Sequence, residues 1–264
     1  MATTFDSVDP GVSIGRVFSR GFGVLVSNPL TMFGVAFLFQ ALPSLLTSYL
    51  RLSLQHDLLN RDGAIGVGAI STASGLIGLV LAMLVQGALV RATVAYSEGR
   101  KASFGESVAA GLAVALPLVG VAILMVLALM VGMLLLVVPA IILYVMWAVA
   151  TPALVEERTG VFGAFGRSRE LTKGARWKVF GVELIIVITL WLIGIVAAAA
   201  ILSRGPAAMQ TITANGFPLW WLVGNAILST ILGALWCAVQ TSLYVELRNW
   251  KDGPSSSGLE EIFS

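Results

Sequence analysis

The sequence predicts an all-α integral membrane protein whose six membrane-spanning helices form three hairpins, each preceded by an amphipathic interfacial helix. Hydrophobic residues make up 58% of the 264 residues, and charged residues only 11%. A soluble domain is about a quarter charged, because most of its surface must face water. A repeated spacing predicts the three units, since a phenylalanine is followed sixteen residues later by Gly-Val three times. The sets are Phe18 with Gly34-Val35, Phe104 with Gly120-Val121, and Phe165 with Gly181-Val182.

Six segments have the roughly 20 mostly apolar residues that a membrane-spanning helix needs. The predicted spans are Leu30 to Leu50, Gly66 to Ala92, two spans within the charge-free stretch between Glu106 and Glu156, Val179 to Leu202, and Leu219 to Leu243. The third and fourth divide near Gly132 to Pro139. Pro152 makes the fourth helix short or broken. One bent helix with a re-entrant segment is the alternative, and it would place the two termini on opposite sides.

The distribution of lysine and arginine predicts the orientation, because these residues are enriched in cytoplasmic loops. With six spans, one side holds 13 of the 16 lysine and arginine residues, and the other holds only Arg51, Arg61 and Arg204. Both termini are therefore expected on the cytoplasmic side.

Short amphipathic segments are expected to lie in the interface before each odd-numbered span. They cover Val12 to Ser27, Ser103 to Gly111, and Val161 to Gly174. One membrane domain, residues 1–250, then consists of hairpin units at about 12–96, 98–155 and 156–246, with a flexible cytoplasmic tail at 251–264. The repeated glycines, Gly34, Gly120 and Gly181, are predicted to let neighbouring helices approach closely.

Glu183 is the only acidic residue inside a predicted span. A charge at membrane depth is costly and is by default a functional candidate. A structural ion pair with Arg91 or Arg20 is the favoured interpretation, and a proton or ion site is the alternative. The other intramembrane polar candidates are Gln86, Asn225 and Gln240, which suit interhelical hydrogen bonds or a polar path.

A cluster of cations surrounds the third amphipathic segment. Its members are Arg158, Arg167, Arg169, Lys173, Arg176 and Lys178. Each can contribute roughly 1 kcal/mol to binding of anionic lipid headgroups near a charged surface. Cytoplasmic orientation alone would also place cations here, so both interpretations stay open.

The remaining motifs predict neither a metal site nor a cofactor. His56, Asp57 and Asp62 lie in the first outer loop, where one histidine without a nearby cysteine is a weak metal signal. A solvated loop is the favoured interpretation. The net charge of +2 is too small to argue for nucleic acid.

Several stretches look familiar as sequence. They are Pro-Ala-Ile-Ile from Pro139, TPALVEE from Thr151 to Glu157, SRELTKGARWKVFG from Ser168 to Gly181, and the N-terminal VFSRGFGVLVSNPLTMFGV. Together they resemble the membrane domain attached to some bacterial glycerophosphodiester phosphodiesterases, and related stand-alone inner-membrane proteins of uncharacterised function. The resemblance implies a multi-pass protein of the bacterial cytoplasmic membrane.

The resemblance does not imply catalysis. In the fused relatives the activity belongs to a separate soluble barrel domain, for which this chain has no room. We therefore expect a non-catalytic membrane protein that binds lipids, anionic ones in particular, or scaffolds a membrane-protein partner or a second copy of itself. The alternative is a transporter or channel for a lipid or small amphipathic solute.

Overall fold

The structure is a computed structural model that describes residues 11–49, 63–205, 210 and 217–253. These residues form helices and no strand. Six helices are long and apolar enough to cross a membrane, which confirms the all-α, multi-pass class. They are Pro29–Tyr49, Ser71–Ser97, Phe104–Leu135, Val137–Glu157, Arg176–Leu202 and Leu219–Asp252.

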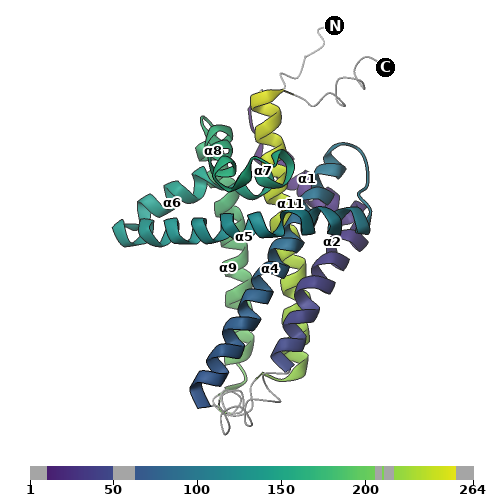
Figure 1. Ribbon diagram of the computed structural model, residues 1–264, viewed down its shortest axis with the longest axis vertical. Coiled ribbons are helices and arrows are strands. Elements are labelled where there is room, and N and C mark those ends of the chain that lie inside the picture. The colour runs from purple at the N-terminus through teal and green to yellow at the C-terminus, as the bar shows by residue number, and fades with distance from the viewer. Residues whose placement is uncertain (1–10, 50–62, 206–209, 211–216, 254–264) are drawn as a thin grey trace.

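Four of these helices run alongside one another, parallel to the long axis of the molecule (Figure 1). The first consists of α2 (Pro29–Ala36), a π-helical turn η1 (Phe37–Ala41) and a continuation to Tyr49. The others are α4 (Gly63–Ser97), α9 (Arg176–Leu202) and α11 (Leu219–Asp252). Within the described residues, most ends of these helices lie within several residues of the predicted ends. The exception is α11, which extends nine residues past the predicted end at Leu243.

The remaining two apolar helices, α5 (Phe104–Leu135) and α6 (Val137–Met146), form a hairpin (Figure 1). This hairpin runs across the four helices that are parallel to the long axis. The turn between α5 and α6 is tight, because a Cβ on Gly132 would lie 2.9 Å from the Cα of Ala140. The sequence indicated two ordinary spans here. Length and hydropathy do not distinguish a helix that crosses a bundle from one that runs along it.

The predicted fourth span is broken, as Pro152 indicated. Helix α6 ends at Met146, and α7 (Ala150–Glu157) begins after a short turn with Pro152 in its first turn. Proline has no N–H to donate to the carbonyl four residues earlier, and its ring clashes there, whereas the first turn of a helix tolerates it.

Two of the three predicted amphipathic segments are separate helices. Helix α1 (Ile14–Ser27) packs mainly against α11, and α8 (Gly160–Thr172) packs mainly against α7. Both lie towards the end of the molecule where α11 finishes (Figure 1). The middle segment is corrected: Ser103 caps the N–H of Glu106, and the residues from Phe104 onward are the first turns of α5 itself. Gly105, Gly111 and Pro117 lie within this continuous helix and do not end it.

Each glycine of the repeated Gly-Val pairs faces another helix. A Cβ on Gly34 would lie 3.7 Å from Phe104, one on Gly120 3.1 Å from Val161, and one on Gly181 3.2 Å from Ile14. The neighbouring valines Val35, Val121 and Val182 are all buried. A closer approach of two helices than at any of these three glycines lies between α4 and α5. A Cβ on Gly111 would come within 2.3 Å of the carbonyl oxygen of Leu84, so only glycine fits there.

Candidate functional site

Glu183 lies on α9, seven residues or about 10 Å of helix from its first residue. Its side chain is buried, with the residue 2% exposed. The hydroxyl of Tyr144 on α6 donates a hydrogen bond to Oε2 at 2.8 Å, and Nε2 of Gln240 on α11 donates to Oε1 at 2.6 Å. Glu183 therefore joins three helices that are far apart in the sequence.

The predicted ion pair of Glu183 is wrong for the part of the chain that the structure describes. Arg91 lies 3.4 Å from both Glu106 and Glu156, and Arg20 lies 3.5 Å from Glu246. The described residues place no lysine or arginine nitrogen within 4 Å of Glu183. The two arginines take carboxylates near the helix ends instead, and amide and phenol donors satisfy the deeper carboxylate.

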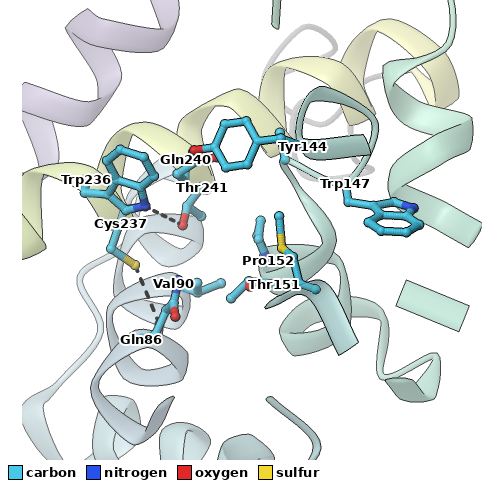
Figure 2. Close-up of a pocket in the computed structure, with 12 residues that line it drawn as sticks. Gln86, Val90, Tyr144, Trp147, Thr151, Pro152, Trp236, Cys237, Gln240 and Thr241 are labelled. Atoms are coloured by element: carbon cyan, nitrogen blue, oxygen red, sulfur yellow. Dashed lines mark hydrogen bonds between the residues drawn. The ribbon is translucent and has the colours of Figure 1, made fainter. Parts of the chain in front are cut away.

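A cavity of about 180 Å³ lies beside this cluster, between α4, α5, α6, α7 and α11 (Figure 2). Its polar lining comes from Gln86, Tyr144, Thr151, Gln240 and Thr241. A single buried water needs about 10–15 Å³ of such space, so the cavity has room for several waters or a small organic group.

One buried polar atom of a residue that lines the cavity has no partner in the described structure. Gln240 is 6% exposed, and its Oε1 accepts no hydrogen bond although its Nε2 donates to Glu183. Nearby groups are satisfied: the thiol of Cys237 donates to the main-chain oxygen of Gln86, and the hydroxyl of Thr241 donates to the main-chain oxygen of Cys237 (Figure 2). Buried acceptors without partners are rare in folded proteins.

The structure brings together three of the four intramembrane polar candidates. Gln86 and Gln240 line the cavity, and Glu183 lies directly behind Gln240. Asn225 is exposed on α11 and belongs to no part of this site. Sequence reasoning missed Tyr144. A tyrosine within the charge-free stretch between Glu106 and Glu156 is a signal that could have identified it.

The cationic cluster forms a second candidate site, which extends from the end of α7 along α8 to the first turn of α9. Among the described residues, Arg167 is the only member of the cluster in an ion pair: it lies 2.8 Å from Glu157, and it also contacts Glu170 and Asp252. Partial burial acts to lower the pKa of Arg167, but the hydrogen bonds to Glu157 and Asp252 outweigh it, so this pKa lies above its ordinary value. The guanidinium is therefore a fixed structural cation.

The other five cations are exposed, and among the described residues none of them has a carboxylate within 4 Å. They are Arg158, Arg169, Lys173, Arg176 and Lys178. Two aromatic side chains in the same region are also exposed, Phe162 at 81% and Trp177 at 85%. Gly174, with φ of +94°, makes the turn that joins the two helices.

An apolar groove of about 200 Å³ lies between α1, α9 and α11. Phe18 and Phe22 of α1 form one wall, and Ile185 and Thr189 of α9 belong to another. Lys178 lies seven and eleven residues before these two α9 residues, so the helical period places it on the same face of α9.

Other predicted features have different outcomes. The described residues contain no group of three or more His, Cys, Asp or Glu side chains that could hold a metal. His56, Asp57 and Asp62 lie outside the described residues, as do residues 254–264 of the predicted flexible tail. The start of that tail is corrected: α11 continues through Lys251 to Asp252, where the contact with Arg167 holds it.

Comparisons of the chain with protein-family models, with curated proteins and with solved structures find no match. The resemblance to the phosphodiesterase-linked membrane domain stays a prediction.

Proposed function

We propose that the protein is a non-catalytic component of the bacterial cytoplasmic membrane that binds anionic lipid headgroups through the cationic cluster. The observation that carries the proposal is the combination along α8 and the start of α9. Five exposed cations, from the end of α7 to the first turn of α9, have no carboxylate partner among the described residues, and the exposed Phe162 and Trp177 lie in the first turns of α8 and α9.

This combination fits the membrane interface. Aromatic side chains are enriched at the headgroup level, and each cation near an anionic surface contributes roughly 1 kcal/mol. Because the chain is already anchored by its spans, this energy would serve to enrich particular lipids around α8. The membrane spans alone are sufficient to anchor the chain.

The apolar groove supports the same proposal. A lipid headgroup at Lys178 leaves its acyl chain next to Ile185 and Thr189, two to three turns further along the same face of α9. One lipid could thus contact the cation and the groove together.

The test is native mass spectrometry of protein extracted gently from membranes that contain phosphatidylglycerol and phosphatidylcholine. The double variant Lys173→Gln/Lys178→Gln is compared with Lys101→Gln/Arg204→Gln, which removes two exposed cations away from α8 and the start of α9. The first should retain less phosphatidylglycerol, by up to about thirtyfold for the loss of two contacts. The second should match the wild type. Equal losses in both variants would show a non-specific charge effect and contradict the proposal.

A transporter or channel for a lipid or small amphipathic solute is the second candidate, favoured by the cavity that Gln86 and Gln240 line beside Glu183. Flux across liposomes that contain the purified protein distinguishes the two. A flux that Glu183→Gln abolishes while lipid retention stays unchanged supports transport.

The proposed orientation has both termini in the cytoplasm, and the crosswise hairpin is compatible with it. If the hairpin of α5 and α6 does not cross the membrane, the chain has four spans instead of six. Because two crossings are lost together, the charged segments before and after the hairpin stay on the same side of the membrane. The alternative of five spans would reverse this for the C-terminal half.

A further inference from the structure

We propose that the α5–α6 hairpin lies flat within one leaflet of the membrane, surrounded by lipid acyl chains, and does not cross the bilayer. The leaflet is the one on the side of the cationic cluster, which is the cytoplasmic leaflet in the proposed orientation. This inference does not depend on headgroup binding by the cluster, because it concerns the depth and the surface of a different pair of helices.

The first argument is the direction of the hairpin. Helices α4, α9 and α11 run along the long axis of the molecule, and α5 and α6 run across them (Figure 1). Helix α5 has 32 residues and is therefore about 48 Å long, whereas the hydrocarbon core is about 30 Å thick. If the helices along the long axis cross the membrane, a helix of this length across them lies along the membrane plane.

The second argument is the depth at which α5 crosses α4. Gly111 of α5 packs on α4 between Leu84 and Ala88. These residues lie three to seven positions before Arg91, or about 5–10 Å of helix. Arg91 forms an ion pair with Glu106 in the first turn of α5, which marks the level of the interface. Half of the hydrocarbon core is about 15 Å thick, so the crossing lies within one leaflet.

The third argument is that the hairpin stays at this level. Gly120 lies sixteen residues, or about 24 Å of helix, from the start of α5, which on an upright helix is most of the way across the core. Yet a Cβ on Gly120 would lie 3.1 Å from Val161 of α8, three residues from Arg158. On the return, the hydroxyl of Ser168 in α8 donates to the main-chain oxygen of Met146 at 3.0 Å. Both arms of the hairpin therefore contact the helix that carries the cationic cluster.

The fourth argument identifies acyl chains as the surroundings. Between Ser107 and Thr151 the sequence contains no charged residue and no serine, threonine, asparagine, glutamine or histidine. A helix that lies on the membrane surface has a polar face, whereas one that is apolar all round is buried in protein or in lipid. Within residues 130–138, at the tip, every residue except Gly132 is exposed. A docked protein would cover one side of the tip, whereas acyl chains cover all sides.

The experiment measures the depth of spin labels on single cysteines of the full chain in liposomes. Cys237 is buried and is replaced by serine, which keeps a hydrogen-bond donor. The α5 series consists of Leu116→Cys, Leu127→Cys and Leu134→Cys, all at exposed positions. Depth follows from the ratio of collisions with oxygen, which dissolves in the hydrocarbon core, to collisions with a water-soluble nickel chelate.

The three labels of the α5 series span 18 residues, or about 27 Å of helix. They should nevertheless lie at one depth to within about 5 Å, one helical turn. The matched control series on α9 has the same spacing at exposed positions: Leu184→Cys, Ile195→Cys and Leu202→Cys. Its depth should change steeply, and its last label should meet the nickel chelate at the far interface. A gradient in the α5 series like that of α9 overturns the proposal.

The same labels test what surrounds the tip. Acyl chains leave a label at Leu134→Cys mobile and accessible to oxygen but not to nickel. An immobile label that neither reagent reaches is covered by protein, such as a second copy of the chain, and this result overturns the assignment to lipid.

A second measurement tests the side of the membrane without a depth scale. Spheroplasts and inverted membrane vesicles are treated with a membrane-impermeant maleimide. Leu134→Cys should react in neither preparation, and should react fully after the membrane is dissolved in a denaturing detergent. Leu202→Cys, at the end of α9, is the control and should react in spheroplasts. Reaction of Leu134→Cys in spheroplasts would show that the hairpin crosses the bilayer.

Discussion

Helices α1 and α8 occupy equivalent places in two of the predicted units, yet their cations are used differently. Arg16 of α1 lies 2.6 Å from Glu246 of α11, and Arg20 lies 3.5 Å from the same residue. In α8, three carboxylates from three elements converge on Arg167 alone. Arg169 and the cations that follow it have no carboxylate partner among the described residues.

The difference separates two roles that lysine and arginine share in membrane proteins. Cations on either helix can orient the chain, because orientation depends on their number and side. Only cations that are not already paired are free to bind an external anion. The cations of α1 therefore attach this helix to α11, whereas the cations of α8 form a free basic surface.

The largest expected effect comes from removing the carboxylate that serves α1. Glu246→Gln leaves Arg16 and Arg20 without their shared partner, while Glu246 itself is buried. The buried carboxylate also accepts a hydrogen bond from the main-chain N–H of Ser13, and hydrogen bonds to a charged group contribute about 1.5–3 kcal/mol. The half-exposed side chain of Arg16 can be solvated after the loss, so the change should cost roughly 2–3 kcal/mol. We expect a clearly lower thermal unfolding midpoint of the purified protein. A midpoint equal to the wild type would mean that Glu246 does not hold α1 on α11.

A smaller effect should follow from a single methyl group on each helix. A Cβ on Gly21 of α1 would lie 2.9 Å from Val239 and 3.3 Å from its Cα, whereas a Cβ on Gly166 of α8 meets nothing within 4 Å. Gly21→Ala should cost about 2 kcal/mol by overpacking. Gly166→Ala should be neutral or stabilising by about 0.5–1 kcal/mol, because alanine is the better helix former. Urea or detergent unfolding measures both, and equal effects would contradict the difference in packing.

Local sequence features were sufficient to predict much of the fold. Runs of about 20 apolar residues identified the spans, Pro152 identified the break before α7, and the repeated glycines Gly34, Gly120 and Gly181 each face another helix. These features depend on residues close together in the chain.

What sequence reasoning missed depends on contacts between distant segments. The crosswise direction of α5 and α6 is set by packing, as at Gly111 against α4, and leaves no mark in hydropathy. The partners of Glu183 lie 39 and 57 residues away and are uncharged, so an argument that matched opposite charges selected the wrong residues.

The smallest stability effect, and the sharpest contrast within one helix, concerns Arg167 and Arg169. Arg167→Gln removes the cation that joins Glu157, Glu170 and Asp252, and should cost about 1 kcal/mol because the contacts are partly exposed. Arg169→Gln should change the unfolding free energy by less than about 0.5 kcal/mol, yet weaken retention of phosphatidylglycerol. The paired arginine should thus affect stability more than lipid retention, and the free arginine the reverse. If Arg169→Gln leaves phosphatidylglycerol retention unchanged, α8 is no different from α1, and its exposed cations serve orientation alone.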